Sequence, residues 1–153
     1  MVATARRGRL DEIAQDLFEV VTRVCLTAPR GRRRSEELKE IEYHTLSILQ
    51  GRGTMIVGDI QRLLGVLPAQ MSRIIRSLEN RPLPLIACRI NPQDKRKIDV
   101  HMTEAGDKAL QEYRAVRVRR IAEVLQDLSE GEQENLVHLL DRVRGLLERA
   151  VLA

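Results

Sequence analysis

The chain has 153 residues, of which 43% are hydrophobic, 31% are charged and only 2% are aromatic. These proportions are typical of a soluble globular protein, and the length predicts a single domain over residues 1–153 that folds without a disulfide or a metal. The scarcity of aromatic side chains excludes a face built on base stacking, so binding of single-stranded nucleic acid is not expected. The net charge is +4, and lysine and arginine gather in clusters that could bind phosphate. The alternative is that these clusters are simply solvated faces of the protein.

Other functional classes lack the patterns that they require. No apolar run reaches the ~18 residues of a membrane span, and the N-terminus has no signal-peptide core. The two cysteines, Cys25 and Cys88, are far apart in the sequence and resemble reduced thiols, which indicates a cytoplasmic protein. The three histidines have no metal-ligand spacing, and no nucleophile motif, phosphate loop or pair of catalytic carboxylates occurs. We therefore predict no metal, no cofactor and no enzymatic activity.

Hydrophobic periodicity and turn residues divide the chain into nine elements. Pro29 and Gly31 end the first helix, Ser35 caps the second, Gly58 caps the third, and Gly65 allows a tight turn before Pro68 starts the fourth. The predicted helices cover residues 10–27, 35–50, 58–64, 68–78, 103–128 and 129 onward, and the predicted strands cover residues 55–57, 83–90 and 98–102.

The helix that starts at Pro68 has one apolar and one polar face. An arginine on the polar face could bind guanine with its planar fork, and Gln70 could read adenine through its amide. The alternative is that these side chains are only solvated. For Arg76 a further alternative is an ion pair or contact with Glu79 or Asn80. The apolar face holds Met71, Ile74, Ile75 and Leu78, and the polar face holds Ala69, Gln70, Ser72, Arg73, Arg76 and Ser77.

A basic hairpin follows, in which Asn91–Asp94 supply turn chemistry between two strands. Lys95, Arg96 and Lys97 lie at its tip, where they would suit a narrow A·T-rich minor groove. A turn-linked helix pair beside a basic hairpin predicts a mostly α (α+β) fold, a winged helix-turn-helix over residues 35–102.

The outer helices are too apolar to project alone into water. We expect residues 6–28 and 103–153 to form a helical dimerisation part in which the first and last helices pack against each other and against a second copy. The alternative is that these helices only cover their own domain.

At these residues the chain resembles the MarR family of bacterial transcription regulators. The likeness is carried by residues 58–60, 64–66 and 71–79 for the helix-turn-helix, and by residues 91–96 with Val100, Thr103 and Gly106 for the wing and the start of the long helix. The resemblance implies a homodimer on a pseudo-palindrome in double-stranded DNA, with the second helix of the pair in the major groove and the wing in the minor groove. It places Ala69, Gln70, Ser72 and Arg73 against bases and Arg76 against backbone or bases. It also places Arg96 at the wing tip, with Asp94 steadying the loop.

The family often holds a small ligand between the dimer helices and the DNA-binding part. The residues that we associate with such an effector pocket are Phe18, Tyr43 and Leu46. Some relatives sense oxidants with a cysteine in the first helix, which makes Cys25 either a redox sensor or a small core residue. Some relatives bind zinc in comparable regions, but Glu42 and His44 with Cys25 lack a completing histidine.

Three departures from the family pattern affect the DNA-binding part. Leu67 stands where a Ser or Thr cap is usual, so Pro68 must start its helix without side-chain help. The link Arg81–Leu85 is about two residues longer than usual and lacks a Gly, which predicts a displaced wing. Cys88 stands where an Arg is common.

The resulting hypothesis is a dimeric, sequence-specific transcription regulator, more often repressor than activator in this family, released by a small ligand or a stress signal. The alternative is a winged-helix adaptor for other proteins, or a non-specific architectural DNA binder.

Overall fold

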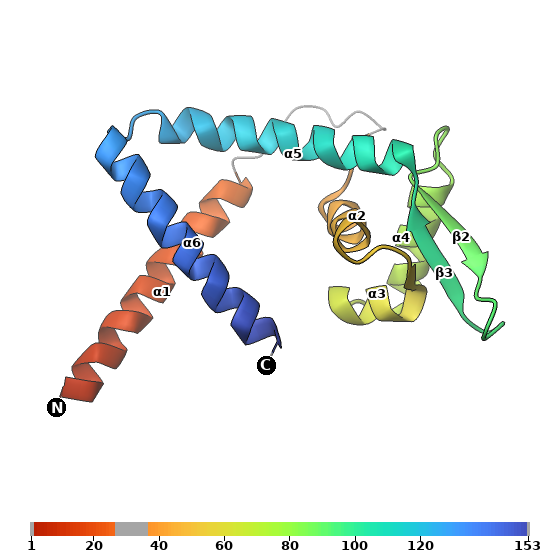
Figure 1. The fold of residues 1–153 in the computed structure, drawn as a ribbon, viewed down its shortest axis with the longest axis horizontal. Coiled ribbons are helices and arrows are strands. Elements are labelled where there is room, and N and C mark those ends of the chain that lie inside the picture. Colours follow the sequence, from red (N-terminus) through yellow and green to blue (C-terminus); the bar gives the residue numbers. More distant parts are fainter. Residues whose placement is uncertain (1, 27–36, 153) are drawn as a thin grey trace. The chain divides into compact units, whose positions relative to one another are not determined.

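The computed structural model describes residues 2–26 and 37–152, and within them the mostly α winged helix-turn-helix fold is confirmed (Figure 1). The chain divides into two compact units, which we call the helical unit (residues 1–29 with 117–153) and the winged-helix unit (residues 30–116). None of the described helices is both long and apolar enough to cross a membrane. The elements in chain order are α1 (Val2–Leu26), α2 (Glu40–Arg52), β1 (Met55–Ile56), α3 (Val57–Leu64), α4 (Pro68–Glu79), β2 (Ile86–Ile90), β3 (Ile98–Met102), α5 (Glu104–Leu125) and α6 (Glu130–Leu152).

The winged-helix unit is built on a three-stranded antiparallel sheet in the order β1-β3-β2. Ile86 pairs with Met102 at one end of the β2–β3 hairpin, and Ile90 pairs with Ile98 at the other. Helices α2, α3 and α4 gather beside the hairpin, which extends beyond them (Figure 1). The core between helices and sheet consists of Leu38, Leu46, Leu49, Ile60, Met71, Ile74, Leu78, Leu85, Ile86, Val100 and Leu110.

Helix starts are the main corrections to the sequence prediction. Helix α2 begins at Glu40 rather than at Ser35, which lies outside the described residues, because the Glu42 carboxylate accepts a hydrogen bond from the Lys39 amide (2.8 Å) and so caps it. Helix α3 begins at Val57, so Gly58 lies inside its first turn and does not cap it. Helix α1 begins at Val2, well before the apolar stripe, because alanine and arginine favour a helix without apolar periodicity.

Two further boundaries differ from the prediction. Strand β2 begins at Ile86 rather than at Leu83, because Pro82 and Pro84 have no amide hydrogen to donate to a neighbouring strand. Helix α5 ends at Leu125 rather than near Leu128, where the backbone tightens into a turn.

Local caps and turns agree with the prediction. Gly65 adopts the left-handed conformation (φ 65°), and Pro68 is the first residue of α4. The Thr103 hydroxyl caps α5 by accepting a hydrogen bond from the Gly106 amide (3.1 Å). Ser129 and Glu132 form the predicted capping box, in which the Ser129 amide donates to the Glu132 carboxylate (2.8 Å).

The helical unit, taken by itself, leaves many large apolar side chains exposed. Phe18 is 74% exposed and Leu139 is 61% exposed, whereas the residues of a closed core are almost inaccessible. Large apolar side chains that stay exposed along three helices are typical of an interaction surface. The exposed set is Leu10, Ile13, Leu17, Phe18, Val20, Val21, Val24 and Leu26 on α1, Val118, Ile121 and Val124 on α5, and Val137, Leu139, Leu140, Val143, Leu146 and Leu147 on α6.

Candidate nucleic-acid interface

Helices α3 and α4 are joined by a short, fixed turn. The Gly65 amide donates to the Arg62 carbonyl (3.2 Å), which closes the last turn of α3. Leu67 is the N-cap of α4 and makes no side-chain capping bond, as the departure from the family pattern predicted. The fixed ring of Pro68 therefore starts α4. The turn sets the angle at which α4 is presented.

Helix α4 buries one face and exposes the other. Met71, Ile74 and Leu78 are buried and Ile75 is half-buried, so the predicted apolar face is correct. Ser72 donates its hydroxyl to the Pro68 carbonyl (3.1 Å). The exposed face comprises Ala69, Gln70, Ser72, Arg73, Arg76 and Ser77, which we call the recognition face.

The two arginines of the recognition face are not engaged by acidic neighbours. Among the described residues, neither Arg73 nor Arg76 forms an ion pair, and Arg76 does not bind Glu79. The first turn of α4 contains no acidic residue. The guanidinium groups are thus free to donate to an external acceptor, and no carboxylate at the helix start would repel a phosphate.

The wing turn is organised by Asn91. Its side-chain oxygen accepts hydrogen bonds from the amides of Gln93 and Asp94 (both 2.9 Å), and its side-chain nitrogen donates to Asp99 (2.9 Å). The Asn91 amide also donates to the Lys97 carbonyl (2.9 Å), which closes the hairpin. The turn is therefore ordered by an asparagine that the sequence indicated only as turn chemistry.

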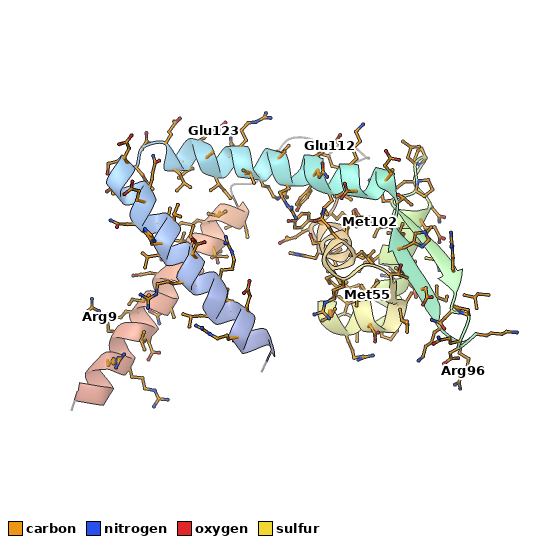
Figure 2. The ribbon with its side chains drawn as sticks, in the orientation of Figure 1. Arg9, Met55, Arg96, Met102, Glu112 and Glu123 are labelled. Atoms are coloured by element: carbon orange, nitrogen blue, oxygen red, sulfur yellow. The ribbon has the colours of Figure 1, made fainter. Side chains whose placement is uncertain are left out.

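Asp94 holds the basic tip of the wing. Its Oδ1 accepts from the Arg96 amide (3.1 Å) and from the Arg96 Nε (3.2 Å), and Lys97 Nζ lies 3.8 Å from Oδ2. These bonds, the Arg96 amide first, lower the pKa of Asp94 below its usual value. The hold is thus complete above the ordinary carboxyl pKa and is lost as pH falls through the lowered value. The Arg96 side chain is 91% exposed at the outer end of the hairpin (Figure 2), and three cations against one carboxylate leave the tip positive.

A buried carboxylate ties the C-terminal end of α4 to α2. Glu42 is 1% exposed, and its Oε1 accepts from the Ser77 hydroxyl (2.5 Å) while its Oε2 accepts from Arg81 Nη2 (2.8 Å). The same carboxylate caps the Lys39 amide. Sequence reasoning missed this network, because it considered Glu42 only as a candidate metal ligand, which it rejected, and Ser77 only as a surface residue. The available signal was an acid at the third position of a helix, which is a capping position.

The long link between α4 and β2 is anchored at its far end as well. The Leu85 amide donates to the Leu78 carbonyl (3.0 Å), and the Thr103 amide donates to the Leu85 carbonyl (3.1 Å). The Thr103 hydroxyl donates to the Pro84 carbonyl (2.6 Å). A Cβ on Gly106 would lie 2.1 Å from the Leu85 oxygen, so only glycine permits this approach. The root of the wing is therefore fixed by backbone contacts.

The three residues predicted for an effector pocket are distributed over both units. Tyr43 is half-buried and stacks on Tyr113 of α5 with ring centroids 4.4 Å apart. Leu46 is fully buried in the core of the winged-helix unit, and Phe18 is exposed on the helical unit. Of the three, Tyr43 and Phe18 therefore have surface that a ligand could contact.

The cysteines differ from each other in their surroundings. Cys25 is exposed in the single chain, which corrects its interpretation as a small core residue. Burial, followed by the charge of Glu79, raises the pKa of the Cys88 thiol, which disfavours the reactive thiolate. Within residues 2–26 and 37–152 no group of three potential ligands could hold a metal ion, and Glu42 is engaged by Arg81.

A turn-linked helix pair with an exposed basic face and a basic hairpin together define the winged helix-turn-helix class. Residues 38–98 match the model of the MarR family, which confirms over this part of the chain the resemblance seen in the sequence. The chain is 27% identical over 134 residues to an uncharacterised helix-turn-helix-type transcriptional regulator, YkoM of Bacillus subtilis, covering 86% of each chain.

Two solved structures share the fold. The transcriptional regulator Tm0710 from Thermotoga maritima superposes with a TM-score of 0.73 at 19% identity, covering 94% of this chain and 99% of the other. The PcaV transcriptional regulator from Streptomyces coelicolor, solved in complex with its natural ligand, superposes with a TM-score of 0.54 at 22% identity, covering 87% and 89%. Both likenesses are likenesses of fold.

Proposed function

We propose that this protein is a sequence-specific regulator that binds double-stranded DNA as a homodimer and represses transcription in the cytoplasm. The observation that carries the proposal is the recognition face of α4, where Arg73 and Arg76 are exposed and form no ion pair among the described residues. The basic tip of the wing, with Lys95, Arg96 and Lys97, supplies a second positive contact in the same unit. A helix in the major groove and a hairpin in the minor groove would use both.

The dimer is proposed from the exposed apolar side chains of α1 and α6. In a two-fold dimer both subunits contribute the same surface to the interface. The apolar side chains of both subunits are then removed from water together. A small-molecule effector is proposed from the resemblance and from the ligand held by PcaV. Tyr43, which packs against the core that contains Leu46, is the proposed contact within the winged-helix unit, and Phe18 is the proposed contact within the helical unit.

Base reading by Arg73 is the direct test of the proposal. We expect Arg73→Ala to cost about 1–3 kcal/mol in binding to the best duplex and much less in binding to random duplexes, because a bidentate base contact is lost. Arg73→Lys is the control that keeps the charge but not the fork, so it should recover only part of the preference. Fluorescence anisotropy on both duplexes measures the difference. An equal loss on both would make Arg73 a backbone clamp and leave base reading to Gln70, Ser72 or Arg76.

The wing should contribute affinity rather than sequence preference. We expect Arg96→Ala to weaken binding to many sequences and to reduce the dependence of affinity on salt by about one phosphate contact. The melting temperature should change as little as it does for ordinary surface substitutions, because Arg96 is exposed at a hairpin tip. Titrations at several salt concentrations measure this effect. Unchanged affinity would show that the wing does not reach DNA.

Sedimentation tests the dimer. At micromolar concentration we expect about twice the chain mass of 17.5 kDa, because exposed leucines and valines on α1 and α6 favour burial against a second copy. The double variant Leu17→Glu/Leu140→Glu should sediment as a monomer, because charge cannot be buried unpaired in such an interface. A wild-type monomer that still binds a palindrome would contradict the dimer.

A further inference from the structure

Leu67 is an unusual residue for its position in the helix-turn-helix. It is the N-cap of α4, where a Ser, Thr, Asp or Asn side chain ordinarily accepts a hydrogen bond from the helix. Leu67 provides no such bond and exposes 74% of its surface. The chain therefore gives up a stabilising cap and places a large aliphatic group in water at the start of the recognition helix.

The core does not require this leucine. Val66 and Met71 occupy the two positions that ordinarily staple a helix start to the core, and Val66 packs against the core while Met71 is 1% exposed. The backbone at Leu67 is nevertheless fixed, because its carbonyl accepts from the Met71 amide (2.9 Å) and the ring of Pro68 follows. Leu67 is thus held in place and directed away from the interior.

The surroundings of Leu67 indicate what would cover it. In helix-turn-helix proteins the N-terminal residues of the second helix contact base edges in the major groove. Pro68 and Ala69 are also exposed, so the leading end of α4 is apolar over three residues, and the cations of Arg73 and Arg76 follow on the same helix. In the major groove, thymine is the base that presents an apolar group, its C5 methyl.

We propose that Leu67 contacts the C5 methyl of a thymine in each half-site and so determines specificity at that position. This inference rests on the proposed sequence-specific DNA binding and adds one base identity to it. Burial of a methyl group is worth about a fourfold change in affinity. The leucine thus replaces a helix cap with a base contact.

The test uses the full-length protein and a duplex selected from random DNA. Each thymine of one half-site is replaced in turn by deoxyuracil, which removes only the C5 methyl. We expect one position at which wild-type affinity falls about fourfold and at which Leu67→Ser binds both duplexes equally. Leu67→Ser should keep or raise the melting temperature, because serine is a preferred cap.

Leu83→Ser is the matched control, since Leu83 is 72% exposed but lies in the link between α4 and β2. It should retain the full response to deoxyuracil. If no thymine responds, or if the response persists in Leu67→Ser, the inference is wrong while specific binding stands. If Leu67→Ser weakens every duplex equally, Leu67 contacts the sugar-phosphate backbone and the inference is likewise wrong. Failure of the wild type to prefer any duplex would overturn the proposed function and this inference together.

Discussion

Gly106→Ala should destabilise the protein by about 3 kcal/mol, which for a chain of this length corresponds to a fall in Tm of roughly 6–12 °C. An added Cβ would lie 2.1 Å from the Leu85 carbonyl oxygen and 2.7 Å from the Met102 Cγ. The oxygen belongs to the backbone and also accepts from the Thr103 amide, so it cannot move without releasing the start of α5. Thermal unfolding followed by circular dichroism measures the loss.

Gly58→Ala is the matched control in the same unit. Gly58 lies in α3 with nothing within 4 Å of an added Cβ, and alanine favours a helix. We expect it to leave Tm unchanged or to raise it slightly. A Tm for Gly106→Ala within 2 °C of the wild type would contradict the close approach of α5 to Leu85.

Removal of the buried carboxylate at Glu42 should lower the free energy of unfolding by about 3–5 kcal/mol. The substitution breaks a buried ion pair and takes one hydrogen-bond acceptor from each of its partners. Glu42→Ala removes at once one acceptor of the Lys39 amide, of the Ser77 hydroxyl and of the Arg81 guanidinium. These three groups belong to the start of α2, to α4 and to the link that follows α4. Urea denaturation measures the free energy of unfolding.

Glu40→Ala provides the comparison on the same helix. The Glu40 side chain is 71% exposed and lies 3.8 Å from His44, so its loss should change stability by less than about 0.5 kcal/mol. Equal effects of the two substitutions would mean that the Glu42 network does not hold α4 against α2.

The sequence predicted those features whose cause is local. Gly65, Pro68, Thr103 and the box of Ser129 with Glu132 act within one turn, and each occupies its predicted position. The two faces of α4 follow from the helical period, so the recognition face was also predictable. Its contacts with bases stay a prediction.

Features that join distant segments were not predictable in this way. The bond between Glu42 and Arg81 spans 39 residues, and the requirement for glycine at position 106 depends on a carbonyl at Leu85. The apolar residues from Leu83 onward suggested a longer strand, but prolines at 82 and 84 prevent strand pairing there. The exposure of Cys25 likewise depends on which other segments of the chain pack against α1, and the local sequence does not show this.

Selection of duplexes from random DNA, followed by titration of the best duplex and an unselected one across salt concentrations, tests the central claim most directly. Two recognition helices on one face of the duplex require an inverted repeat with half-sites about 10–10.5 base pairs apart. We expect affinity to fall linearly with the logarithm of salt concentration while a preference of at least about 10³-fold for the selected duplex persists. Recovery of no inverted repeat, with equal affinity for both duplexes at every salt concentration, would contradict the account.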